Sequence, residues 1–130
     1  MSGMAEERLE LVQPENFLCM KSWTGNLPLF LFHDGGGSTL AYHCLEPMGR
    51  FVYGVNNPCF FKKPFESIPK MAVQYVKRVK ATVAAPNFPA KRKGKKPVDI
   101  LVGGWSLGGM TSLEVARQLA GDEDVRVKAA

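Results

Sequence analysis

Cysteine and histidine are scarce in this 130-residue sequence, which contains three of the former and two of the latter. The cysteines are widely spaced and odd in number, so they provide neither a disulfide framework nor the paired spacing of a zinc site. We expect reduced, partly buried thiols at Cys19, Cys44 and Cys59, as in an intracellular protein. No metal and no cofactor are predicted.

Long hydrophobic runs are also missing. No run approaches the roughly 20 apolar residues of a membrane-spanning helix. The first twelve residues are acidic and polar, unlike the apolar core of a secretory signal. The sequence therefore predicts a cytoplasmic protein with no membrane partner. Because 45% of the residues are hydrophobic and 22% are charged, the composition is that of a globular domain.

The net charge is +5, and much of it comes from KRKGKK at residues 91–96. Such a run can attract nucleic acid, a membrane surface or an acidic protein. No aromatic residues alternate with these cations, as they would in a single-strand binder, and no zinc-finger or RNA-binding signature is present. We therefore expect a solvated loop and no nucleic-acid partner, while docking of an acidic carrier protein stays open.

Strands and helices are expected to alternate along the sequence. Apolar runs between turn residues predict strands at 27–32, at 51–55, at 98–102 and from residue 125 onward. Capping residues and helical periodicity predict helices at 38–48, after Ser67 and at 107–120. This alternation predicts an α/β fold, in which a mostly parallel sheet carries helices on both faces.

Two of these helices have a predicted buried face. In the helix after Ser67, apolar residues recur at the helical period. They are Ile68, Met71, Ala72, Tyr75, Val76 and Val79. In the helix at 107–120, we expect the apolar side chains of the second half to face the core. They are Leu113, Ala116, Leu119 and Ala120.

The stretch GGWSLGGM, residues 103–110, lies between a predicted strand and a predicted helix. One interpretation is a phosphate-binding loop, because Gly104 and Gly109 have the GxxxxG spacing. Met110 stands where such a loop has its lysine, and a thioether cannot pair with phosphate oxygens, so this interpretation is disfavoured. A second interpretation is a tight glycine turn in which Ser106 merely caps the helix.

The third interpretation is a nucleophile elbow, with G-x-S-x-G at residues 104–108. The sharp turn presents the hydroxyl of Ser106 at the tip of the sheet, and both flanking positions are glycine because a side chain there would collide with backbone. The main-chain N–H of Leu107 lies at the helix N-terminus, where partial positive charge stabilises an oxyanion. The strand-then-helix context favours this interpretation.

A second glycine-rich stretch, HDGGG at residues 33–37, also follows a predicted strand. The carboxyl ends of parallel strands meet at one edge of the sheet, which is where α/β proteins bind ligands. Hydrolases with a nucleophile elbow take their other oxyanion donor from a main-chain N–H in a loop of this kind. The two stretches together predict one site.

The segments FHDGGGSTLAYHCL, FVYGVNNP and LVGGWSLGGMTSLEVARQL resemble the thioesterase domains of the α/β-hydrolase superfamily. These domains release acyl chains from polyketide, non-ribosomal peptide and fatty-acid synthases, and GWSLGG followed by EVARQL is particularly like the fungal polyketide synthase type. The resemblance runs from about residue 25 to the end and covers the N-terminal half of such a domain. We therefore assign residues 1–24 to an N-terminal segment and residues 25–130 to a partial, truncated α/β-hydrolase domain.

The resemblance implies roles for individual residues. Ser106 would be the acyl nucleophile, and the main-chain N–H groups of Leu107 and Gly35 would form the oxyanion hole, with Gly36 as the competing second donor. Trp105 and Tyr42 would line the acyl approach. The implied substrate is an acyl thioester on a phosphopantetheine arm or on coenzyme A, and an acyl carrier protein is the implied partner.

The general base of such a site is missing from the sequence. A serine nucleophile needs a histidine oriented by a carboxylate, and in this superfamily both follow the serine. No histidine follows Ser106. Of the later carboxylates, Glu114 is expected to face away from the site, and the acidic run at 122–124 is expected at the other end of the sheet.

The two histidines, His33 and His43, precede the serine and have no evident carboxylate partner, so structural roles are expected for both. The sequence therefore predicts a thioesterase-type acyl hydrolase acting on carrier-protein or coenzyme A thioesters, incomplete because the Asp and His of the triad are absent. A general esterase or lipase, and a non-catalytic module that binds a carrier protein, stay open as alternatives.

Overall fold

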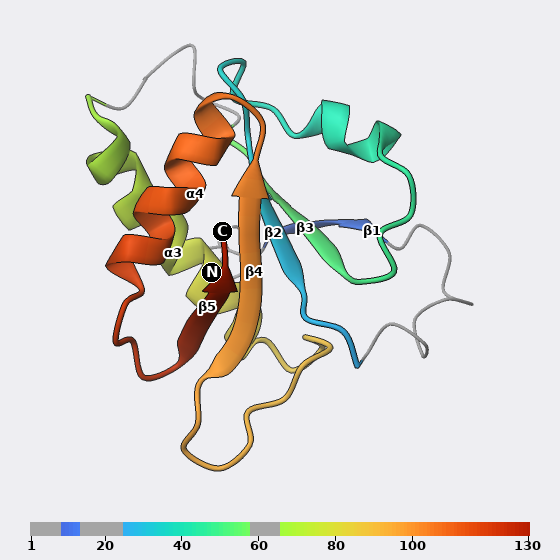
Figure 1. Cartoon of the computed structure of the whole chain (residues 1–130), viewed down its shortest axis with the longest axis vertical. Helices are drawn as coiled ribbons and strands as arrows, with labels where there is room; N and C mark the ends of the chain where they lie inside the picture. The colour runs from blue at the N-terminus through green and yellow to red at the C-terminus, as the bar shows by residue number, and fades with distance from the viewer. Residues whose placement is uncertain (1–8, 14–24, 58–65) are drawn as a thin grey trace, which may run out of the picture.

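Five strands form one sheet at the centre of the structure, a computed structural model that describes residues 9–13, 25–57 and 66–130 (Figure 1). The strands are β1 (Glu10–Gln13), β2 (Leu29–Phe32), β3 (Val52–Val55), β4 (Val98–Gly104) and β5 (Val125–Ala129). Their order across the sheet is β1-β3-β2-β4-β5. Strands β2 to β5 pair in parallel, and β1 joins the edge antiparallel to β3. The predicted mostly parallel α/β sheet is confirmed.

Helices of different kinds cover the two faces of the sheet. Among the described residues, the α-helices α3 (Ile68–Ala84) and α4 (Leu107–Gln118) pack together over one face, where the side chains of Phe30 and Phe32 join the larger core (Figure 1). Leu29 and Leu31 alternate to the opposite face, where they cluster with Tyr42 of the short 3-10 helix η2 (Leu40–Cys44). Both faces of β2 are therefore buried, as its continuous apolar sequence predicts.

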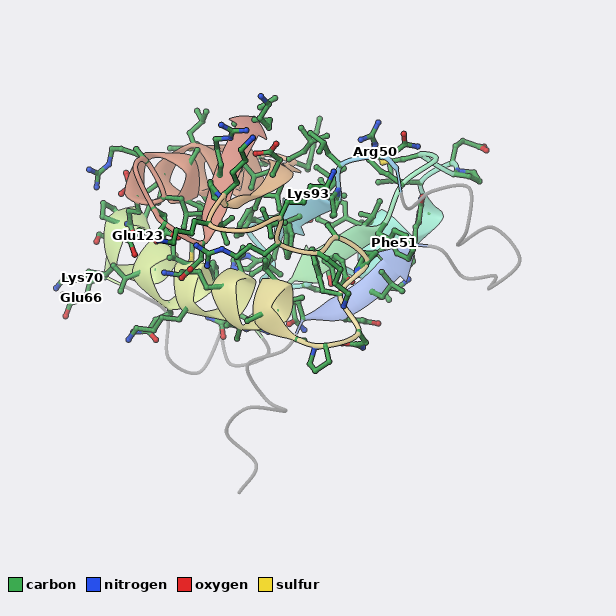
Figure 2. The ribbon with its side chains drawn as sticks, turned by 90° about the horizontal axis from the view of Figure 1, so that it is seen from below. Arg50, Phe51, Glu66, Lys70, Lys93 and Glu123 are labelled. Atoms are coloured by element: carbon green, nitrogen blue, oxygen red, sulfur yellow. The ribbon has the colours of Figure 1, made fainter. Side chains whose placement is uncertain are left out.

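The helix after Ser67 forms as predicted. The hydroxyl of Ser67 accepts a hydrogen bond from the main-chain N–H of Lys70, and Pro69 lies in the first turn. Buried residues follow the predicted stripe: Met71, Ala72, Tyr75 and Val79. Lys70 also pairs with Glu66, one turn earlier, on the outer surface (Figure 2).

The predicted helix at 38–48 is wrong in length and type, because only Leu40–Cys44 is helical and its turns are 3-10. Thr39 offers no side-chain cap, and Tyr42 is the one buried residue of the segment. Leu40, the first residue of this helix, is 76% exposed. A segment with one buried anchor lacks the apolar stripe that stabilises an α-helix.

The predicted buried face of α4 is also wrong in part. Leu113 is 63% exposed, and Ala120 is exposed beyond the helix end. The residues that face the sheet are smaller, and they follow the same helical period: Gly108, Thr111, Ser112, Val115 and Leu119. Small side chains let α4 lie close to the strands, so the positions of its large apolar residues do not identify the buried face of the helix.

Strand β1 was missed by the sequence analysis. It lies within residues 1–24, which were assigned to a separate N-terminal segment, and it pairs through Leu11 with Tyr53 of β3. The side chain of Val12, in this strand, is buried on the face of the sheet that η2 covers. The boundary between residues 24 and 25 stays a prediction, but residues 10–13 belong to the sheet.

Candidate functional site

The turn between β4 and α4 has the geometry of a strained corner. Ser106 has φ 56° and ψ −118°, and it is the one non-glycine residue with positive φ in the described part of the chain. Its side chain is exposed and makes no capping hydrogen bond to α4. The interpretation of Ser106 as an idle helix cap is therefore wrong. Such strained backbone persists only where the surroundings impose it, most often at functional sites.

The two glycines that flank the serine are required by close backbone contacts. A Cβ atom at Gly104 would lie 2.4 Å from the carbonyl carbon of Gly108. A Cβ atom at Gly108 would lie 2.2 Å from the carbonyl oxygen of Phe32, at the end of β2. Real Cβ atoms do not approach backbone so closely, so neither position accepts a side chain without moving the turn. This is the collision that the elbow interpretation predicts.

The loop after β2 lies beside this turn. Strands β2 and β4 are neighbours, and Phe32 is paired with Gly104 at their carboxyl ends. The loop at 33–37 and the turn at 105–108 therefore leave the sheet at the same edge (Figure 1). In that view the edge is the upper end of β4.

Two main-chain N–H groups at this edge are available to a ligand. Leu107 is the first residue of α4, and its N–H donates to no group in the described ranges; the same holds for the N–H of Gly35. In contrast, the N–H of Gly36 donates to Oδ1 of Asp34 at 2.8 Å, and the N–H of Gly37 donates to the carbonyl oxygen of Asp34. Of the two predicted donors in this loop, Gly35 is thus the one that is not already engaged.

The side chains of Trp105 and Tyr42 differ in exposure, although a hydrogen bond joins the two residues. The indole of Trp105 is 73% exposed, whereas Tyr42 is 8% exposed and lies beneath the turn. The Tyr42 hydroxyl accepts from the main-chain N–H of Trp105 at 2.8 Å and donates to the carbonyl oxygen of Phe32 at 2.6 Å. Burial raises the pKa of the Tyr42 phenol, so it stays protonated at neutral pH.

His33 is a buried structural residue. Its Nδ1 lies 2.7 Å from the carbonyl oxygen of Asp34 and its Nε2 lies 2.6 Å from the hydroxyl of Tyr75. Because a carbonyl oxygen only accepts, Nδ1 carries the proton and Nε2 accepts from Tyr75. Burial lowers the pKa of this imidazole, which favours the neutral form. Both ring nitrogens are thus occupied by groups other than Ser106.

His43 and Glu114, which are expected to take no part in the site, also interact with groups other than the serine. His43 is partly exposed and lies 3.5 Å from a carboxylate oxygen of Glu10. Glu114 is held by Arg117 and Gln118, whose hydrogen bonds lower its pKa to about 2. No hydrogen bond joins Ser106 Oγ to any residue in the parts of the chain that the structure describes.

The basic run lies at the opposite end of β4 from the serine (Figure 1). Figure 2 views the molecule from this end and labels Lys93 and Glu123. Arg92 pairs with Asp124 at 2.6 Å, so the acidic run at 122–124 neutralises part of the basic one, and Asp122 pairs with Lys80 of α3 at 2.9 Å. Two hollows of about 390 and 330 Å³ border this loop.

The described residues contain neither a metal-binding cluster nor a membrane-spanning helix. No group of three or more histidine, cysteine or carboxylate side chains is placed to hold a metal ion there. None of the helices described has the length and apolar character needed to cross a membrane. Cys44 is exposed rather than partly buried, and Cys19 and Cys59 lie outside the described residues.

Comparison with curated proteins finds fungal thioesterases, although no protein-family model matches the sequence. The chain is 42% identical over 102 residues to the probable thioesterase gloN of Glarea lozoyensis, covering 77% of this chain and 32% of that protein. It is 39% identical over 100 residues to the orsellinic acid synthase armB of Armillaria mellea, covering 76% of this chain and 4% of the synthase. The chain thus spans about a third of the gloN thioesterase.

Solved structures give the same result. The fold matches the NocB thioesterase domain, solved as a covalent complex with a fluorophosphonate nocardicin G analogue, with a TM-score of 0.60 and 28% identity. The match covers 82% of this chain and 43% of that one. A four-domain nonribosomal peptide synthetase bound to AMP and glycine matches with a TM-score of 0.59 over 82% of this chain and 8% of its own. The predicted resemblance to thioesterase domains of the α/β-hydrolase fold is confirmed.

Proposed function

We propose that this chain uses Ser106 as an acyl nucleophile. Its sequence and fold resemble part of a polyketide- or peptide-synthetase-type thioesterase domain of the α/β-hydrolase superfamily. The observation that carries the proposal is the strained backbone of Ser106, with φ 56° at a corner closed by Gly104 and Gly108. Strain at an exposed serine contributes nothing to packing, whereas it is what presents a hydroxyl to a substrate.

The chemistry follows from the groups around that hydroxyl. Ser106 Oγ would attack the carbonyl carbon of an acyl thioester, the C–S bond would break, and the thiol would leave with the serine proton. Water would then cleave the resulting ester and release the acid. In the addition step, negative charge develops on the carbonyl oxygen, and the unpaired N–H groups of Leu107 and Gly35 support that charge.

The helix that begins at Leu107 adds to this stabilisation. Its twelve residues place the positive end of the helix dipole at the turn, next to the developing oxyanion. Removal of one oxyanion donor in a serine hydrolase costs about 3 kcal/mol in the transition state, a factor of about 100 or more in rate. The main-chain donors explain how the site can favour acyl transfer even where the base is supplied from elsewhere.

The substrate is proposed as an acyl group on a phosphopantetheine arm, carried by an acyl carrier protein or by coenzyme A. Support comes from the relatives, several of which are thioesterases and two of which are orsellinic acid synthases. A thioester is also the more reactive acyl donor, since its thiol leaves more readily than an alcohol. A general esterase would instead cleave oxygen esters at comparable rates.

The test is labelling of the serine by an alkyl fluorophosphonate, with imidazole added as an external base. Because neither histidine contacts Ser106, free imidazole should accelerate the labelling, and mass spectrometry should locate the adduct on Ser106. Ser106→Ala should abolish it, while Ser38→Ala, which removes another exposed serine at the same sheet edge, should not. Labelling that survives Ser106→Ala would refute the proposed nucleophile.

Substrate class is tested separately. Acetyl-pantetheine and the matching oxygen ester can be compared under the same imidazole conditions, with the rate of Ser106-dependent acylation as the readout. Faster acylation by the thioester supports the thioesterase assignment. Equal or faster acylation by the oxygen ester would favour the general esterase.

A further inference from the structure

We propose that Tyr42 is a positioning residue, whose hydroxyl holds the Ser106 turn in register with the loop after β2. This inference rests on the proposed function, because the two segments that it joins are those that carry the nucleophile and the two N–H donors. It replaces the expected role of Tyr42 as a residue that lines the acyl approach.

The first step of the argument is the geometry of one hydroxyl. Tyr42 Oη donates to the carbonyl oxygen of Phe32 at 2.6 Å and accepts from the N–H of Trp105 at 2.8 Å. Phe32 is the last residue of β2, and Trp105 follows the last residue of β4. A single side chain, 63 residues from Trp105 in the sequence, therefore links the ends of two parallel strands.

The second step is what these two main-chain groups control. The N–H of Trp105 belongs to the residue directly before the strained serine, so its hydrogen bond helps to fix the entry to the turn. The carbonyl of Phe32 packs against the Cα of Gly108 on the far side of the turn, where a Cβ would lie 2.2 Å away. By binding the Phe32 carbonyl, Tyr42 thus helps to fix the group against which Gly108, in the first turn of α4, packs.

The third step excludes the lining role for the hydroxyl. Tyr42 is 8% exposed, and its one O–H donor and an acceptor lone pair are already used by main chain. A phenol that bound the acyl group would have to break one of these bonds. Loss of the hydroxyl should instead remove the hydrogen bond that it donates to a buried carbonyl and the one that it accepts from a partly buried N–H, which destabilises the local arrangement.

The experiment compares Tyr42→Phe with Tyr53→Phe in the full chain. Tyr53 is equally buried, at 8% exposure, and stacks on Phe30 and Phe88 without a hydrogen bond among the described residues. Each variant loses one tyrosine hydroxyl, but only that of Tyr42 lies at the turn. The second-order rate of imidazole-assisted labelling at Ser106 is measured with a short-chain and a long-chain fluorophosphonate, alongside thermal unfolding.

We expect Tyr42→Phe to lower the labelling rate about tenfold for both probes, with Tyr53→Phe within twofold of the parent chain. We also expect amide hydrogen exchange at Trp105 to accelerate selectively in Tyr42→Phe, which a general loss of stability would not produce. Unchanged labelling in folded Tyr42→Phe, or a loss confined to the long-chain probe, would overturn the positioning role. If the variant unfolds, the same measurements in sucrose restore the folded state for the comparison.

The two proposals fail in distinguishable ways. A parent chain that is not labelled at Ser106 refutes the nucleophile and leaves the exchange of the Trp105 amide to decide the role of Tyr42. A parent chain that is labelled, with Tyr42→Phe equally reactive, refutes only the positioning role.

Discussion

Gly108, in the first turn of α4, packs directly against the carbonyl oxygen of Phe32 at the end of β2. The contact brings the helix N-terminus onto the sheet edge where Ser106 and the loop at 33–37 emerge. It leaves no room for a methyl group. Shape at this contact, rather than any charged group, is what places the serine beside the two N–H donors.

Substitution of Gly108 by alanine should therefore be severely destabilising. A methyl group 2.2 Å from a carbonyl oxygen forces α4 away from the sheet, and we expect a loss of about 3 kcal/mol in the free energy of unfolding. Urea denaturation measures it. Gly103→Ala is the matched control, because its Cβ would meet only Leu31 Cδ2 at 3.6 Å, and it should stay within about 1 kcal/mol of the parent chain. Equal effects at both positions would contradict this account.

Ser106→Gly should make the chain more stable while removing its reactivity. Glycine adopts a positive φ without steric cost, whereas serine at φ 56° and ψ −118° is strained. We expect a gain of about 1 kcal/mol in the free energy of unfolding after the greater entropy of glycine in the unfolded chain is subtracted. Ser106→Ala keeps the Cβ and the strain, so it should gain much less. A stabilisation that is the same in both variants would assign the effect to the lost hydroxyl instead.

The alternation of strands and helices from β2 onward and the conformation of the turn could both be predicted from sequence. The close contact between Gly104 and Gly108 is local, so the G-x-S-x-G spacing around Ser106 identifies the turn from sequence, whereas the contact of Gly108 with Phe32 depends on the tertiary structure. The inner face of α4 could not be predicted in the same way. Its contacts depend on how closely the helix approaches the sheet, which favours Thr111 and Ser112 over Leu113.

Long-range hydrogen bonds could not be predicted from the sequence either. Tyr42 reaches Trp105 across 63 positions, and nothing in the pattern AYHCL distinguishes a tyrosine that binds main chain from one that lines a pocket. Strand β1 was missed for a related reason. Its four residues, ELVQ, are stabilised by pairing with β3 rather than by any strong propensity of their own.

Stability should fall on mild acidification because of His33. Burial lowers its pKa below the ordinary value of 6.5, so below that pH the unfolded chain binds a proton that the folded chain does not. The free energy of unfolding should therefore decrease as the pH falls from 6.5 toward the lower folded-state pKa, and it should be flat above 7.5. Urea denaturation across this range measures the slope. His33→Asn should flatten it; a slope that survives His33→Asn would assign the effect to another group.

Reversal of charge on the basic run should leave the reactivity of Ser106 unchanged. Strand β4 separates them, and its seven residues span about 20 Å, well beyond the Debye length of about 8 Å at physiological ionic strength. We expect the chain with Lys93→Glu and Lys96→Glu to be labelled at Ser106 at a rate within twofold of the parent chain.

Trp105→Ala, next to the serine, should instead slow the labelling of Ser106 by a long-chain fluorophosphonate, because the exposed indole offers an apolar surface to the alkyl group.

The same pair of lysine substitutions distinguishes two ways in which a carrier protein could approach. A carrier that delivers its acyl group to Ser106 must present it at the carboxyl end of β4, so its acyl transfer should not depend on Lys93 and Lys96. Slower transfer from the carrier with unchanged transfer from free acetyl-pantetheine would show that the basic run contributes to carrier docking after all. Since acidic partners lose affinity for lysines as salt screens the charges, that contribution should also vanish between 0.05 and about 0.5 M salt.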